Sequence, residues 1–165
     1  MSILKDAPLS EISNHTFASI IKNGVSGEKA LVSNQNFQKG DIVTEFEAEN
    51  TSHSPSYLTL QTGEHLHITL KPAFLQYINH SCNPNVFFNT SSMQLVALKE
   101  ICIGDEFVFF YPSTEWKMAQ PFDCYCGSKN CLQHISGAIS LPTYIISSYD
   151  FTDFIQHKLH NQLQK

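Results

Sequence analysis

The chain has 165 residues, of which 42% are hydrophobic and 15% charged, so it is long enough for one domain with one apolar core and too apolar to be disordered throughout. No stretch reaches the roughly 18 apolar residues of a membrane span and the N-terminus lacks a secretory signal, which predicts an intracellular soluble protein, nuclear or cytoplasmic, without a membrane partner. The net charge of −5 argues against direct binding to nucleic acid and favours a basic peptide as partner.

Short β segments are expected over the first two thirds of the chain. Turn signals and β-branched or aromatic residues predict strands over 29–33, 41–47, 57–61, 65–70, 93–98 and 106–111. The third and fourth of these ranges flank Thr62-Gly63 and are predicted to form a hairpin. Pro72 begins a predicted helical turn over 72–78. The apolar spacing from Thr143 to Leu163 predicts one amphipathic C-terminal helix.

The five cysteines of this expected intracellular chain are better explained as metal ligands, reactive thiols or core residues than as a disulfide framework. Three of them lie in Cys124-Tyr125-Cys126-Gly127-Ser128-Lys129-Asn130-Cys131, a C-x-C-x4-C spacing typical of zinc sites. A structural zinc ion takes four ligands. The fourth must therefore come from elsewhere, and Cys82, Cys102 and His134 are the candidates.

Two further segments carry unusual chemistry. The first, Tyr77-Ile78-Asn79-His80-Ser81-Cys82-Asn83-Pro84-Asn85, places many polar groups directly after an apolar stretch. Such groups are costly in a core unless each is paired, so we expect the segment to bind a ligand or to fix a loop. The second, Gly104-Asp105-Glu106-Phe107-Val108-Phe109-Phe110-Tyr111, is an aromatic run that ends in a tyrosine.

Over residues 24–137 the chain resembles the SET-domain family of protein-lysine methyltransferases. The resemblance lies in three motifs and their order: Asn79-His80-Ser81-Cys82-x-Pro84-Asn85, the aromatic run that ends at Tyr111, and the cysteine cluster. The resemblance implies a mostly β fold of small antiparallel sheets with a pseudoknot, to which the C-terminal helix is added. It divides the chain into a SET domain with a short N-terminal extension over 1–118, a post-SET zinc-binding segment over 119–137 and a C-terminal helical extension over 138–165.

The resemblance also implies S-adenosylmethionine as cofactor, one structural zinc ion, and a lysine-containing protein or peptide, such as a histone tail, as substrate. We expect a monomer or a weak dimer. The implied site has Tyr111 as the catalytic residue, Asn79, His80, Glu28, Lys29, Ala30, Tyr57 and Tyr125 at the cofactor, Phe109 and Phe110 along the substrate channel, and Cys82, Cys124, Cys126 and Cys131 at the metal. Cys102 is then most simply a core residue.

Two positions depart from the family pattern. Glu28-Lys29-Ala30 stands where the family usually carries Gly-x-Gly, a backbone that lets the cofactor approach closely. Phe110 stands where many relatives have an aspartate before the tyrosine. The leading hypothesis is a protein-lysine N-methyltransferase. The alternatives are a catalytically inactive SET module that binds a peptide or protein partner, and a zinc-stabilised scaffold without a cofactor.

Overall fold

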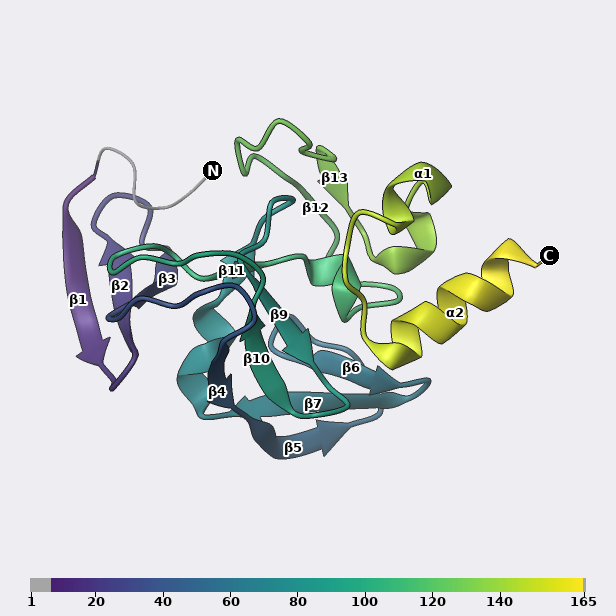
Figure 1. The fold of residues 1–165 in the computed structure, drawn as a ribbon, viewed down its shortest axis with the longest axis horizontal. Helices are drawn as coiled ribbons and strands as arrows, with labels where there is room; N and C mark the ends of the chain where they lie inside the picture. The colour runs from purple at the N-terminus through teal and green to yellow at the C-terminus, as the bar shows by residue number, and fades with distance from the viewer. Residues whose placement is uncertain (1–6, 165) are drawn as a thin grey trace.

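The computed structural model describes residues 7–164, and its strands form small sheets of two or three strands each (Figure 1). One antiparallel sheet has the order β1-β2-β3, with β1 at Leu9–Asn14, β2 at Ala18–Asn23 and β3 at Lys29–Ser33. It lies at the end of the molecule opposite the C-terminus. The predicted strand over 29–33 is therefore confirmed.

Two antiparallel sheets of three strands form the middle of the molecule. Their orders are β4-β10-β9, with β4 at Ile42–Glu45, β10 at Gln94–Ala97 and β9 at Val86–Asn89, and β5-β7-β6, with β5 at Glu47–Ser52, β7 at Leu66–Lys71 and β6 at Leu60–Gly63. Two shorter pairs complete the set: β8 (Asn79–His80) lies parallel to β11 (Val108–Phe109), and β12 (Phe122–Asp123) lies antiparallel to β13 (His134–Ile135). The prediction of small, mostly antiparallel sheets is confirmed.

The main core lies between these sheets because strands such as β9 and β10 turn an apolar face inward. In β9 and β10 the buried residues alternate with partly exposed ones, as expected for strands that cover a core with one face. Phe88 and Leu95 point inward from these strands and are fully buried, as are Leu31 and Phe107. Burial of each such side chain contributes about 1.5–3 kcal/mol.

The structure shifts two of the predicted strand boundaries. The predicted hairpin is present as β6 and β7, but its turn lies at residues 64–65, and the strand register is irregular between Gln61 and Gly63. Of the strand predicted over 106–111, only Val108–Phe109 forms a strand, β11; Glu106 makes an isolated bridge to Val32, and a 3-10 turn, η2 (Tyr111–Ser113), follows. Pro112 explains this ending because it has no N–H for a strand ladder and its fixed φ suits the turn.

The predicted C-terminal helix is confirmed, but it begins at Asp153 and is not continuous from Thr143. The chain forms a 3-10 turn η3 (Ala138–Ser140), a short α1 (Thr143–Ile146) and then α2 (Asp153–Leu163). The interruption between α1 and α2 brings Tyr149 and Phe151 onto the ring of Phe110, with which Tyr149 stacks at 3.8 Å between ring centroids. These rings are part of a second, smaller core. The helical turn predicted over 72–78 is confirmed as η1 (Ala73–Tyr77). Within residues 7–164, no helix has the length and apolar character that crossing a membrane requires.

Gly137 is the point at which the C-terminal part of the chain packs most closely on the turn after η2. Its φ of +117° and ψ of 173° belong to a region open almost only to glycine. A Cβ atom there would also stand 2.5 Å from the carbonyl oxygen of Trp116. Only a bare backbone therefore fits between these segments.

We predict that Gly137→Ala lowers the free energy of unfolding by about 2–4 kcal/mol, because the strained backbone and the clash with Trp116 act together. Gly40→Ala is the matched control, since Gly40 has a φ of +93° and open space at its Cβ position. Urea unfolding of both variants measures the difference. Equal losses in the two variants would show that the contact with Trp116 does not matter.

Candidate active site

The parallel pairing of β8 with β11 brings the two unusual polar and aromatic segments of the sequence side by side. Just after β11, the backbone N–H of Tyr111 donates to Nδ1 of His80 at 3.2 Å, and the Tyr111 hydroxyl donates to the Ile78 carbonyl at 3.4 Å. Burial, with a smaller effect of the Glu106 carboxylate, raises the pKa of Tyr111 to about 12. The phenol is therefore a protonated hydrogen-bond donor at neutral pH.

Asn79 is fixed by two hydrogen bonds to different parts of the chain. Its side-chain Nδ2 donates to the carbonyl of Lys29 at 2.9 Å and to Oε1 of Glu106 at 3.0 Å. The carboxamide therefore joins β3 to the segment that leads into β11. Burial lowers the pKa of the neighbouring His80 to about 3, so its ring is neutral and its Nδ1 can accept from Tyr111.

Two cavities meet at Tyr111. The larger, of about 1050 Å³, we call the polar cavity; Asn79, His80, Lys29 and Tyr125 are among the residues that line it. The smaller, of about 310 Å³, we call the apolar cavity. It is lined mainly by apolar side chains that include Leu58, Leu60, Leu75, Ile78, Phe109 and Met118. Tyr111 and Phe122 line both cavities, and their rings stand edge to face at 5.9 Å. These two rings form the wall that the cavities share.

The cysteine sulfurs gather in one place next to the polar cavity. The Sγ atoms of Cys82, Cys124, Cys126 and Cys131 all lie within 4.8 Å of one another, and those of Cys82 and Cys124 are 4.0 Å apart. A tetrahedral zinc ion with bonds of about 2.3 Å holds its sulfurs about 3.8 Å apart. The four side chains therefore fit the ligand set of a structural zinc ion.

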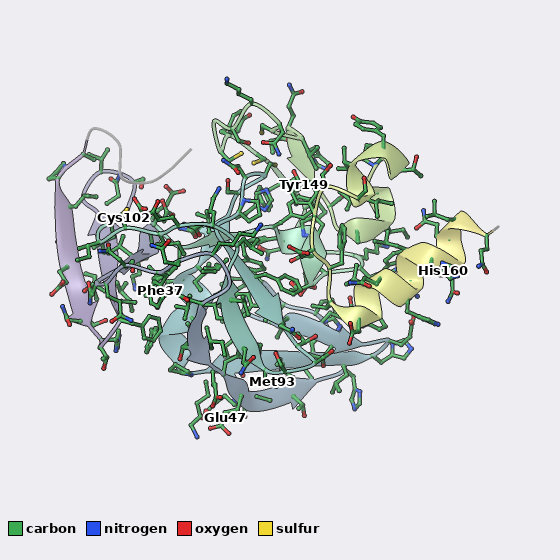
Figure 2. The ribbon with its side chains drawn as sticks, in the orientation of Figure 1. Phe37, Glu47, Met93, Cys102, Tyr149 and His160 are labelled. Carbon is green, nitrogen blue, oxygen red and sulfur yellow. The ribbon has the colours of Figure 1, made fainter. Side chains whose placement is uncertain are left out.

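Two hydrogen bonds fix the backbone at Cys82, one from the cysteine loop and one from the C-terminal part of the chain. The hydroxyl of Tyr149 and Nδ2 of Asn130 both donate to the carbonyl of Cys82, at 2.8 and 2.7 Å. Figure 2 labels Tyr149 at this junction and Cys102 on the opposite side of the view, over the first sheet. Cys102 is exposed, so the expectation of a core residue is wrong: the turn at residues 102–105 faces solvent.

One acidic group is buried at the apolar cavity. Glu115 lines the cavity and is only 7% exposed. Its Oε1 accepts a hydrogen bond from the backbone N–H of Gln61 at 3.0 Å. Burial raises its pKa to about 8, and the bond from Gln61 opposes only part of that rise. The carboxyl group is therefore mostly protonated at neutral pH while the cavity is empty.

Comparison with known proteins assigns the chain to a family. The model of the SET domain matches residues 28–112. The chain belongs to the SET-domain family. This match includes the polar segment with Cys82, β11 and Tyr111, whereas Cys124, Cys126 and Cys131 follow it in the chain. The boundaries predicted at 118/119 and 137/138 stay predictions.

Several curated proteins resemble this SET domain and the residues around it. The methyltransferase flvH of Aspergillus flavus is 44% identical over 96 residues, which cover 57% of this chain and 53% of that protein. The H3 lysine-36 specific histone-lysine N-methyltransferase of Saccharomyces cerevisiae is 29% identical over 130 residues, covering 69% of this chain and 18% of that protein. The corresponding enzyme of Kluyveromyces lactis is 32% identical over 104 residues, covering 59% and 14%. The chain thus spans about half or less of the length of these relatives.

The structure brings most of the predicted site residues together. Around the polar cavity lie Asn79, His80, Glu28, Lys29, Tyr111 and Tyr125. Phe109 lines the apolar cavity, and Tyr57, which is 75% exposed, lies at that same cavity and not among the polar-cavity residues. Ala30 is fully buried in β3, and Phe110 belongs to the second core instead of the apolar cavity. The roles of all these residues stay predictions.

Two carboxyl groups at the site have no role in the sequence-based hypothesis. Glu106 lies in the aromatic run that ends at Tyr111, but only the structure reveals that its carboxylate accepts a hydrogen bond from the carboxamide of Asn79. Glu115 lies in an ordinary polar stretch after Tyr111, and no pattern in the sequence indicates that the chain folds it inward. Its burial depends on contact with β6, which is distant in sequence.

We predict that the SET domain as purified holds about one zinc ion per chain and that Cys126→Ser lowers this content and destabilises the C-terminal third. Elemental analysis and thermal unfolding measure the two effects. Cys102→Ser is the control, because that thiol is exposed and lies outside the cluster. Full zinc content in Cys126→Ser would exclude this ligand set.

We further predict a pH-dependent gain in stability on Glu115→Gln. The pKa of Glu115 is raised from 4.5 to about 8 in the folded protein, so the native state binds this proton more tightly than the unfolded chain. The stability that the bound proton contributes is complete below the unfolded-state pKa of 4.5 and is lost as the pH rises through the folded-state pKa of about 8. Relative to Glu115→Gln, the wild type should lose about 2–4 kcal/mol of unfolding free energy over that range. Urea unfolding at a series of pH values measures the difference, and a constant difference would contradict the assignment.

Proposed function

We propose that the SET domain is an S-adenosylmethionine-dependent protein-lysine N-methyltransferase. The observation that carries the proposal is the position of Tyr111 in the wall between two cavities of different chemistry, one polar and one apolar. A transfer between two reactants needs such an arrangement, because each reactant is held on its own side and the reacting groups are aligned at the wall. The related proteins named as methyltransferases support the same reaction class.

The polar cavity suits the cofactor in size and in donors. Its volume of about 1050 Å³ lies just above the roughly 300–1,000 Å³ of ligand sites. In the proposed role Asn79 and His80 bind the polar groups of the cofactor, and the ring of Tyr125, 74% exposed, offers a flat face for its base. When bound, S-adenosylmethionine supplies a methyl group on a sulfonium centre.

The Glu28-Lys29-Ala30 segment borders the polar cavity, which has a volume of about 1050 Å³ with these side chains in place. The ammonium group of Lys29 lies 5.1 Å from the centroid of the Tyr77 ring, which is not among the residues of the polar cavity. The backbone carbonyl of Lys29 accepts from Asn79. Lys29 holds the variable position of the pattern; the two glycine positions are held by Glu28, which lines the polar cavity, and by Ala30, which is fully buried in β3.

The apolar cavity suits the substrate lysine. Phe109 and Tyr111, with centroids 4.6 Å apart, present two rings to a side chain that enters it. Such walls exclude water and lower the pKa of an ammonium group, which favours the neutral amine that accepts a methyl group. The protonated hydroxyl of Tyr111, held by the carbonyl of Ile78, would orient the reacting groups at the wall.

The substrate in this proposal is a basic protein, for which a histone tail is the leading candidate. Two of the relatives are named H3 lysine-36 specific, and the net charge of −5 attracts a basic peptide. We also propose one structural zinc ion at the cysteine cluster and a monomer or weak dimer inside the cell. The inactive module remains the second candidate, favoured by Glu28-Lys29-Ala30 in place of Gly-x-Gly.

The test begins with calorimetric titration of the wild type with S-adenosylmethionine and with its demethylated product. Binding is expected, and its absence would favour the inactive module. Methyl transfer is then measured on a histone H3 peptide that contains lysine 36. We predict that Tyr111→Phe keeps cofactor binding and loses about 100-fold or more in transfer rate, the usual effect of removing a donor from the transition state.

The matched control is Tyr144→Phe, which removes the same hydroxyl from a ring that is 79% exposed on α1. It should transfer methyl groups as the wild type does. Equal transfer by Tyr111→Phe and the wild type would remove the role assigned to Tyr111.

A further inference from the structure

Glu115 is a buried acid without a counter-ion in the part of the chain that the structure describes. The ion pairs found there join Lys71 to Glu47, His134 to Asp123 and Lys158 to Glu64, and none includes Glu115. Its side chain has one hydrogen bond within residues 7–164, the one that Oε1 accepts from Gln61. A buried carboxylate in this position is costly unless a cation pairs with it.

The elements packed around Glu115 offer no such cation. On β6 the neighbour is the neutral Gln61, and on η3 Ala138 bonds only to the Glu115 backbone. On η2 the titratable group is the protonated phenol of Tyr111, which shares the cavity. On α2 the ammonium group of Lys158 lies over the ring of Trp116, but both carboxylate oxygens of Glu64 already hold it, at 2.9 and 3.0 Å.

A purely structural role does not require an ionisable group here. The hydrogen bond from Gln61 needs only an acceptor oxygen, which a glutamine side chain supplies without the cost of burying a charge. The reciprocal bond, from the N–H of Trp116 to Oε1 of Gln61 at 2.9 Å, already ties the same two segments together. The carboxyl group therefore brings a cost to the empty cavity that only a charged occupant offsets.

We propose that Glu115 is a specificity-determining residue that selects a primary alkylammonium group, the end of a lysine side chain, for the apolar cavity. The proposal rests on the proposed function for the identity of that occupant. In the empty cavity Glu115 is a neutral acid. When an ammonium group enters, the acid releases its proton to solvent, and the resulting carboxylate pairs with the ammonium.

This pairing acts when the substrate binds, before the amine is deprotonated. Glu115 is therefore a positioning residue and not a group that takes part in the transfer. Its loss should raise both KM and kcat for a lysine substrate and leave kcat/KM nearly unchanged, because the interaction is made in the bound ground state and not in the transition state. The raised pKa of Glu115 fits this exchange, since the acid is poised to ionise when a cation arrives.

The test uses n-butylammonium, which reproduces the end of a lysine side chain, and 1-butanol, a neutral molecule of the same length. NMR titration gives the dissociation constant of each. The wild type should prefer n-butylammonium by about tenfold or more, and Glu115→Gln, which keeps the acceptor for Gln61, should bring the ratio to about one. Glu47→Gln is the control, because Glu47 is an exposed residue on β5 at the far edge of the molecule (Figure 2).

A second measurement needs no variant that might disturb the fold. In the wild type labelled with 13C at glutamate carboxyl groups, n-butylammonium should lower the pKa of Glu115 and 1-butanol should not. An unchanged pKa, together with the same ratio of dissociation constants in Glu115→Gln and the wild type, would overturn the proposal.

This outcome is separate from the fate of the proposed function. Methyl transfer by the wild type to the H3 peptide tests the function without reference to Glu115. If the wild type transfers methyl groups but its preference for n-butylammonium is independent of Glu115, the inference fails and the function stands. If Glu115 governs the preference in a protein that transfers no methyl group, the function fails and the ammonium site stands.

Discussion

The site depends on one local constraint, the parallel pairing of β8 with β11 and the hydrogen bond from the Tyr111 N–H to the His80 ring that continues it. Each strand has only two residues, so the pairing alone is weak and the neutral imidazole supplies the next bond. Through it Tyr111 is directed into the wall of both cavities. A protonated imidazole has no acceptor nitrogen and would break this hydrogen bond. The burial of His80 therefore helps to hold Tyr111 in place, because it keeps the ring neutral.

The same short strand also anchors the cysteine cluster. Cys82 follows β8 by two residues, so the motif that lines the polar cavity supplies a sulfur to the cluster in the same turn of chain. The remaining three sulfurs come from the loop beside β12, which also carries Tyr125. A bound metal would hold that loop against the cavity without an apolar core of its own. The polar cavity and the cysteine cluster are thus built from the same short segment of chain.

The residues around β8, β11 and the cysteine cluster could be predicted from the sequence because the patterns that indicate them are local. The cysteine spacing, the polar segment and the aromatic run are each contiguous in the chain. The sequence predicted less well where long-range contacts decide. Periodicity alone suggested one C-terminal helix, but the contact of Tyr149 and Phe151 with Phe110 divides it. Tyr57 matched a short motif yet lies at the other cavity, and Glu115 carries no local signal at all. Tertiary packing outweighs local propensity at each of these positions.

The departure at Phe110 has its own physical logic. A charged side chain before Tyr111 would need a polar partner, whereas the aromatic ring at this position is 2% exposed and stacks on Tyr149. The hydroxyl of Tyr149 in turn donates to the carbonyl of Cys82. This ring stack therefore connects Phe110 to the cysteine cluster and to the C-terminal part of the chain. An aspartate could not make this contact without leaving a charge buried among aromatic rings, so Phe110 and the C-terminal extension are best understood as one unit: the extension supplies the apolar surface that the substitution requires.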